Sequence, residues 1–169
     1  MKVAGPRILS IPEMRAERDR LVAEGKELVF TNGCFDILHR GHVAYLNFAR
    51  NQGDALVVAL NTDASVKSNK GDNRPINNEE DRAYIIGSLR AVDYIVYFED
   101  KEPKDVVAQI LPQVLVKGHD WAHYVSGREV VEANGGRVVL ADLVEGRSTT
   151  RTIERILTVY NKIEDKQSA

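Results

Sequence analysis

Five short apolar segments, each rich in β-branched residues, alternate along this chain with longer segments of helical periodicity. Short apolar runs of this kind are typical of parallel strands that helices bury on both faces. Their alternation with helices predicts an α/β fold, a single-domain doubly wound sheet of five parallel strands. The predicted strands are 28–30, 55–60, 94–98, 114–116 and 138–140.

Start and stop signals mark the helices around these strands. Ser10, with Pro12 and with Glu13 three residues after it, forms the capping-box pattern of an N-terminal helix that Gly25 would end. The other predicted helices are 40–50, 79–89, 106–111, 128–133 and 150–160, with start signals at Asn78, Pro103 and Ser126 and a stop at Gly135.

The length of 169 residues and the hydrophobic content of 43% fit one domain with one core. We expect an N-terminal helical segment at 1–26, the main domain at 27–162 and a frayed tail at 163–169. The net charge of −2, with acidic and basic residues mixed, argues against a nucleic-acid or membrane partner. The single cysteine excludes an internal disulfide, and the lack of a signal-like or membrane-spanning run predicts a cytoplasmic protein.

The segment FTNGCFDILHRGHVAYL, residues 30–46, places two histidines at the predicted start of a helix, after a loop at 31–36. Unpaired backbone N–H groups and the positive end of the helix dipole make such a start a binding site for phosphate. His39 and His42 would present their rings to one anion, and Gly41 would let it approach the backbone. Ordinary half-buried packing of the two rings is the alternative.

Further phosphate-binding residue types follow the fourth and fifth predicted strands. In a doubly wound sheet, ligands bind beyond the carboxyl ends of the strands where the strand order reverses, so these segments and the histidines would meet at one edge. For the hydroxyl residues, capping of the last helix is the alternative role. The residues are Lys117, Gly118 and Asp120 after the fourth strand, and Arg147, Ser148, Thr149 and Thr150 after the fifth.

The segment 61–75 after the second strand is long for a compact domain and rich in cations. We expect a loop that covers a substrate, with a solvated connection as the alternative. Asp63 and Arg82 are candidates for contact with the second substrate or a triphosphate. Asp36, Lys70 and Arg74 complete the predicted substrate-binding set.

Three segments, NGCFDILHRGH, LVKGHDW and EGRSTT, together resemble the nucleotidyltransferase superfamily of cytidylyltransferases and adenylyltransferases, over residues 27–160. The segments NTDASVK, KGDNRP and EEDRAYIIGSLRAVDYIV are most similar to the heptose-1-phosphate adenylyltransferases of lipopolysaccharide-core precursor synthesis. Some members of that family are fused to a sugar kinase, for which we expect no room in this chain. His119 departs from the pattern, because relatives often have glycine there.

The resemblance implies a Rossmann-like fold and transfer of AMP from ATP to a sugar 1-phosphate, D-glycero-D-manno-heptose 1-phosphate, giving ADP-heptose and pyrophosphate. It implies that His39, His42 and Lys117 are catalytic. It also implies a homodimer and Mg²⁺ that bridges the ATP phosphates, with no metal held by the protein itself. The implied nucleotide contacts are Thr31, Asn32, Gly33, Cys34, Phe35, Gly41, Gly118, Asp120, Arg147, Ser148, Thr149 and Thr150.

Three alternatives stay open. A cytidylyltransferase acting on glycerol 3-phosphate or a phosphorylated amino alcohol would use the same motifs. A non-catalytic nucleotide-binding module would bind ATP without releasing pyrophosphate. A zinc hydrolase would draw its ligands from Cys34, His39, His42, His119 and Asp120, whose spacing is poor for zinc.

Overall fold

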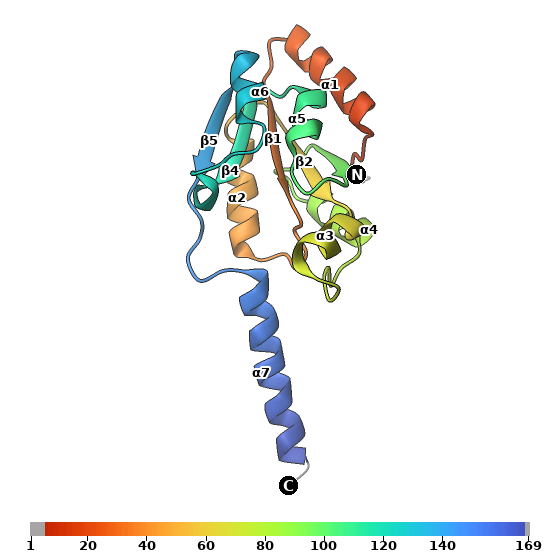
Figure 1. The fold of residues 1–169 in the computed structure, drawn as a ribbon, viewed down its shortest axis with the longest axis vertical. Helices are drawn as coiled ribbons and strands as arrows, with labels where there is room; N and C mark the ends of the chain where they lie inside the picture. The colour runs from red at the N-terminus through yellow and green to blue at the C-terminus, as the bar shows by residue number, and fades with distance from the viewer. Residues whose placement is uncertain (1–5, 168–169) are drawn as a thin grey trace.

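The computed structural model describes residues 6–167, with side chains up to Asn161. Its centre is a five-stranded sheet, parallel throughout, with the strand order β3-β2-β1-β4-β5 (Figure 1). This confirms the predicted fold class and all five predicted strands. The strands are β1 (Leu28–Gly33), β2 (Ala55–Asn61), β3 (Tyr94–Phe98), β4 (Val114–Gly118) and β5 (Arg137–Ala141).

The helices connect consecutive strands and extend the chain at both ends. Each predicted helix is present, with bounds that differ by a few residues. The helices are α1 (Ile11–Ala23), α2 (Arg40–Arg50), α3 (Asp63–Lys70), α4 (Glu79–Gly87), α5 (Lys104–Ile110), the 3-10 turn η1 (His119–Trp121), α6 (Arg128–Ala133) and α7 (Thr149–Gln167).

Two hydrophobic clusters pack against the two faces of the sheet. On one face, α1, α5 and α6 contribute Met14, Val107 and Val131, among others. On the other face, α2 and α4 contribute Leu46 and Ile86, among others. Because α1 packs in the same cluster as the strands, the segment 1–26 and the main domain share a core over the residues described. The core is built from both sides, as a doubly wound sheet requires.

The predicted N-terminal capping box is present. The Ser10 side chain accepts the backbone N–H of Glu13, and the Glu13 carboxylate accepts the backbone N–H of Ser10 at 2.8 Å. Gly25, just after the helix, has φ +72°, a left-handed conformation that glycine adopts without strain. The sequence signals for this helix are therefore confirmed at both ends.

The structure corrects three predicted boundaries. The segment 61–75 is not one long loop, because α3 occupies much of it. Thr62 caps α3 by accepting the Ser65 N–H at 3.3 Å, and Val66 is fully buried, so the chain has both a cap and an apolar anchor there. Likewise β1 continues to Gly33 into the predicted loop, and Gly127 rather than Ser126 caps α6.

The order of the strands reverses between β1 and β4, which places a crevice at their carboxyl ends. The start of α2 follows β1, and the loop before α7 follows β5. In Figure 1, α7 points away from the sheet, so that only its first turns lie near this edge. The helix continues to Gln167 where a frayed tail was predicted, and residues 168–169 lie outside the described residues.

Candidate active site

A hollow of about 370 Å³ lies at the reversal point, beyond the carboxyl ends of β1 and β4. It brings together the loop and helix start after β1, the end of α3, the turn after β4 and the start of α7. The predicted residues that line it are Asn32, Cys34, Phe35, Asp36, His39, Gly41, His42, Lys70, Arg74, Lys117, Gly118, Asp120, Arg147, Ser148, Thr149 and Thr150.

Four predicted residues do not line this hollow. Thr31 is fully buried and its hydroxyl lies 2.7 Å from that of Tyr45. Gly33 ends β1 with the Phe35 ring packed against it. Asp63 and Arg82 are outside the lining and form an ion pair at 2.7 Å. Any effect of these four residues on a ligand in the hollow has to pass through neighbouring residues.

The two histidines stand at the start of α2 with their rings stacked. The ring centroids lie 3.7 Å apart, and the planes are 18° from parallel. His39 is the N-cap residue, since its Nδ1 accepts the His42 backbone N–H at 3.4 Å. A Cβ at Gly41 would lie 3.0 Å from the His39 ring, so the glycine leaves room for this stack. Neutral His39 must therefore carry its proton on Nε2, where it is free to donate.

Both histidines have lowered pKa values. Burial, and then the positive charge of His39 and Lys70, lower the pKa of His42 to about 4. Burial, and then Arg147, lower the pKa of His39. The His42 Nδ1 is buried and has no hydrogen-bond partner in the structure. A pair of neutral rings beside several cations is a site prepared for an anion, because a bound phosphate would accept hydrogen bonds and offset the positive charge.

Lys117 lies at the end of β4, almost fully buried in the wall of the hollow. Its Nζ donates to the Asn32 Oδ1 at 2.7 Å and lies 5.5 Å from the centroid of the Trp121 ring. Burial lowers the pKa of Lys117 to about 8, although the negative charge of Asp120 opposes this shift. Both of these partners are uncharged, so neither neutralises the ammonium, and its charge can act on a ligand.

A second wall of the hollow carries Arg74 and Lys70. The Arg74 Nε donates to the buried Asp36 Oδ2 at 2.6 Å. The Asp36 carboxylate also accepts the backbone N–H groups of Ile76 and Asn77. Burial raises the pKa of Asp36, but the hydrogen bonds from Asn77, Ile76 and Arg74 outweigh it, so the pKa is lowered. Asp36 is thus an ionised anchor for the loop, because its carboxylate binds Arg74 and the amides of Ile76 and Asn77.

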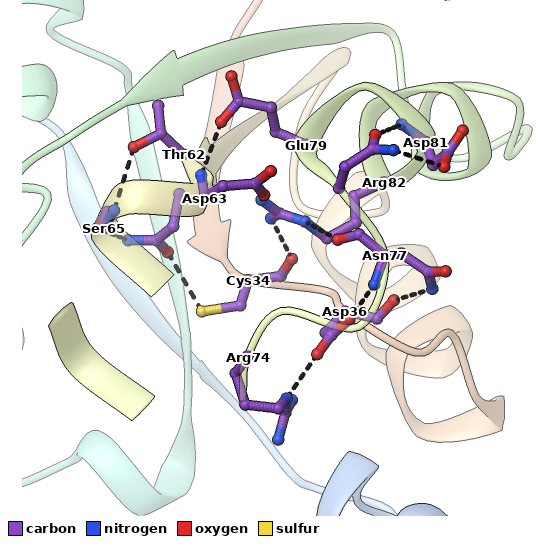
Figure 2. A network of polar contacts seen from close by, with 12 residues as sticks. Cys34, Asp36, Thr62, Asp63, Ser65, Arg74, Asn77, Glu79, Asp81 and Arg82 are labelled. Carbon is purple, nitrogen blue, oxygen red and sulfur yellow. Dashed lines mark hydrogen bonds and ion pairs between the residues drawn. The ribbon is translucent and has the colours of Figure 1, made fainter. Parts of the chain in front are cut away.

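Direct contact between Arg82 and a substrate, as predicted, is corrected by the geometry of its side chain. Arg82 is fully buried, and each guanidinium nitrogen already has an acceptor (Figure 2). The Nε donates to the Asn77 carbonyl at 3.0 Å, and the two terminal nitrogens donate to the Cys34 carbonyl and to Asp63, each at 2.7 Å. The charge pattern of the sequence identified an important arginine but could not show which way it points.

A second hollow of about 420 Å³ adjoins the first and shares His39, Arg147 and Ser148 with it. It is also lined by Arg40, Arg151 and Arg155. Within the described residues, none of its four arginines forms a side-chain hydrogen bond or ion pair, whereas most arginines elsewhere in the fold do. Unneutralised guanidinium groups beside two helix N-termini favour a ligand with several negative charges.

Four further residues of the main hollow, Tyr45, Trp121, Leu143 and Val144, are not among the predicted site residues. Tyr45 lies on the same helix as His42, and Trp121 follows Asp120 directly. Their closeness to the motifs is the only feature of the sequence that could indicate these two residues. Leu143 and Val144 carry no chemical signal of their own. Cys34 lines the hollow with a pKa raised by burial, which agrees with a packing role more than with a nucleophile.

Among residues with described side chains, no group of three or more histidine, cysteine, aspartate or glutamate side chains is arranged to hold a metal ion. The zinc-hydrolase alternative therefore gains no ligand cluster from the fold. In the described part of the chain, no helix is both long and apolar enough to cross a bilayer.

With this geometry in place, comparison with known proteins decides the family. The family model described as cytidylyltransferase-like matches residues 30–162. The chain belongs to the cytidylyltransferase-like family. The matched region contains every residue of both hollows.

The bifunctional protein HldE of Citrifermentans bemidjiense is 55% identical to this chain over 139 residues, which is 82% of this chain and 28% of that protein. HldE of Geobacter sulfurreducens is 52% identical over 141 residues, 83% of this chain and 29% of the relative. The chain thus spans under a third of the length of these curated relatives.

A solved structure of similar fold is that of a lipopolysaccharide core biosynthesis protein from Thermoplasma volcanium. The TM-score is 0.59 at 26% identity, over 73% of this chain and 100% of that one. The pantoate-β-alanine ligase of Francisella tularensis has a TM-score of 0.61 at 14% identity, over 85% of this chain and 69% of that one. The second likeness shows a shared fold only.

Proposed function

We propose that this chain is an adenylyltransferase that transfers AMP from ATP to a sugar 1-phosphate. The acceptor we propose is D-glycero-D-manno-heptose 1-phosphate, with ADP-heptose and pyrophosphate as products. The observation that carries the proposal is the shared hollow, in which His39, His42, Lys117 and Arg147 face one space at the reversal point of the sheet. The identity to HldE proteins and the likeness to a lipopolysaccharide core biosynthesis protein support this choice of acceptor class.

The chemistry needs positioning and charge stabilisation more than a general base. A phosphate monoester has its second ionisation near pH 6, so its oxygen is already a nucleophile at neutral pH. That oxygen would attack the α-phosphorus of ATP in line with the departing pyrophosphate. In the proposed reaction the histidines and Lys117, which line the same hollow, would donate to the α- and β-phosphate oxygens, where negative charge builds up.

The two hollows suggest where the substrates lie. The adjoining hollow with Arg147, Arg151 and Arg155 suits the distal phosphates of ATP, because it continues past His39. Arg74 and Lys70, which line the main hollow but not the adjoining one, suit the phosphate of the acceptor. Mg²⁺ would arrive with ATP and bridge its phosphates, keeping most of its water ligands, since the hollow holds no cage of carboxylates.

A matrix of nucleoside triphosphates against phosphorylated acceptors tests the proposal, scored by pyrophosphate release and with His42→Ala as the control. ATP with heptose 1-phosphate should give the highest kcat/KM. CTP with glycerol 3-phosphate as the best pair would instead establish the cytidylyltransferase alternative. ATP binding without pyrophosphate from any pair would establish the binding-module alternative.

A homodimer and a cytoplasmic location are part of the same proposal, on the strength of the family resemblance. Sedimentation velocity of the purified chain tests the dimer, which predicts a single species of twice the chain mass. Removal of Mg²⁺ with a chelator should abolish pyrophosphate release, and added Mg²⁺ should restore it.

A further inference from the structure

The described part of the fold contains one arginine that is completely buried, and it touches neither hollow. Arg82 lies on α4 with no exposed side-chain surface. A buried guanidinium is costly unless it is well bonded, and each nitrogen of Arg82 has an acceptor. What Arg82 fixes is the junction of three segments: the loop after β1, the start of α3 and the loop before α4 (Figure 2).

The hydrogen bonds continue from Arg82 to the wall of the active-site hollow. Arg82 donates to the carbonyl of Asn77, and the Asn77 side chain donates to the carbonyl of Asp36 at 2.6 Å. The Asn77 backbone N–H donates to the Asp36 carboxylate at 2.9 Å, and that carboxylate accepts from the Arg74 Nε at 2.6 Å. Figure 2 shows these groups as one connected chain from Asp63 to Arg74.

The chain of hydrogen bonds reaches the hollow at its last member, Arg74. Arg74 lines the hollow, whereas Arg82 and Asn77 do not. Because Asp36 binds the Nε, the outer edge of the Arg74 guanidinium, with its two terminal nitrogens, has no partner in the structure and is free for a ligand. Its direction therefore depends on where Asp36 and the loop lie.

We propose that Arg82 is a positioning residue for the acceptor phosphate: through Asn77 and Asp36 it holds Arg74 at the angle and distance from the histidine pair that in-line attack requires. The inference rests on the proposed function, because it names Arg74 as the cation for the acceptor. In the proposed function ATP takes the histidines, Lys117 and the adjoining hollow, so this relay, from Arg82 through Asn77 and Asp36 to Arg74, should affect the acceptor and not ATP. A misplacement of about 1 Å can lower the rate by roughly a hundredfold, which is the scale on which such a relay matters.

The first test is the separation of the two substrates in Arg82→Lys. Lysine keeps the charge but loses the planar fork, so it cannot serve all three acceptors at once. We expect the KM for the acceptor to rise roughly tenfold or more, and the KM for ATP to stay within about threefold. Arg50→Lys is the matched control, since Arg50 is paired with Asp93 at 2.9 Å, away from both hollows. Equal changes in both KM values would overturn the proposal.

A double-mutant cycle tells a relay from a general loss of structure. Arg74→Ala should raise the acceptor KM by itself, and adding Arg82→Lys to it should change that KM little further, because the relay then has nothing to position. Additive effects would overturn the proposal. Asp63→Asn is the milder variant in case Arg82→Lys fails to fold. The Asp63 side chain is one-third exposed, and an asparagine oxygen there can still accept a hydrogen bond from Arg82. We expect this variant to raise the acceptor KM alone, and by less than Arg82→Lys does.

Amide hydrogen exchange tests whether Arg82 orders this loop, and it does not depend on enzyme activity. The Ile76 and Asn77 amides are bonded to Asp36, so they should exchange faster in Arg82→Lys than in wild type or Arg50→Lys. Unchanged exchange at these two amides would overturn the proposal even in an active enzyme. If the wild-type chain releases no pyrophosphate with any pair, the proposed function fails, while this measurement still decides whether Arg82 orders the loop.

Discussion

The His39 ring lies stacked on the His42 ring at 3.7 Å, and its Nδ1 also caps the helix by accepting the His42 backbone N–H. One imidazole therefore holds the helix start in place with one nitrogen and presents the other to the hollow. The two roles can be separated, because asparagine is a good N-cap residue but offers no ring to stack on His42.

His39→Asn and His39→Ala should both lower kcat by roughly a hundredfold, since each removes a donor aimed at the phosphates. Only the alanine variant should lose stability, by about 1 kcal/mol, because the asparagine keeps the cap. Urea unfolding and pyrophosphate release, measured on the same samples, check the pair. Wild-type turnover in His39→Asn would show that His39 is a cap and nothing more.

The pKa of Lys117 predicts an alkaline limit on activity. Because burial lowers this pKa to about 8, the ammonium loses its proton as the pH rises through 8 in the free enzyme, about two and a half pH units below an ordinary lysine. The kcat/KM for ATP should therefore fall above pH 8. In Lys117→Arg the charge persists to much higher pH, so this fall should disappear even though the absolute rate is lower. The same alkaline limb in both proteins would assign the titration to another group.

Tyr45 predicts an effect on stability. Its hydroxyl donates to the Val116 carbonyl at 3.0 Å and lies 2.7 Å from the Thr31 hydroxyl, which ties α2 to β4 and β1 beneath the hollow. Tyr45→Phe should lower the free energy of unfolding by about 1–2 kcal/mol, because two buried groups lose their partner. Tyr160→Phe, on the exposed surface of α7, is the control and should change it by less than about 0.5 kcal/mol. Equal effects in chemical denaturation would contradict this reading.

The periodicity of the sequence was sufficient for the sheet and for the edge where the site lies. Apolar runs such as 114–116 and the cap at Ser10 are local signals, and they predict strand and helix start reliably because burial on both faces and capping are decided within a few residues. The prediction of a loop over 61–75 is wrong for the opposite reason, because the signal for α3 is not local. The charged and polar residues of this segment surround one buried hydrophobic side chain, Val66, which anchors α3 in the tertiary structure.

The candidate site likewise has parts that local sequence signals predict and parts that depend on tertiary contacts. The motif residues meet at one hollow because the carboxyl ends of parallel strands share an edge, which topology alone dictates. Arg82 could not be assigned from sequence, since an arginine on a helix reads the same whether it faces a ligand or a buried carbonyl. Its partners Cys34 and Asp63 are 48 and 19 residues away in sequence, so only the folded chain reveals them.

The arginines of the adjoining hollow predict how the product is held. Arg151→Ala/Arg155→Ala should weaken inhibition by inorganic pyrophosphate roughly tenfold or more, because charge-assisted hydrogen bonds to its oxygens are lost. Arg15→Ala/Arg128→Ala removes the same charge from arginines that are ion-paired elsewhere, and it should leave inhibition unchanged. The difference between the two double variants should shrink as salt rises, since exposed charges are screened. Calorimetric titration of pyrophosphate into each protein measures it directly, and equal affinities would place pyrophosphate in the main hollow alone.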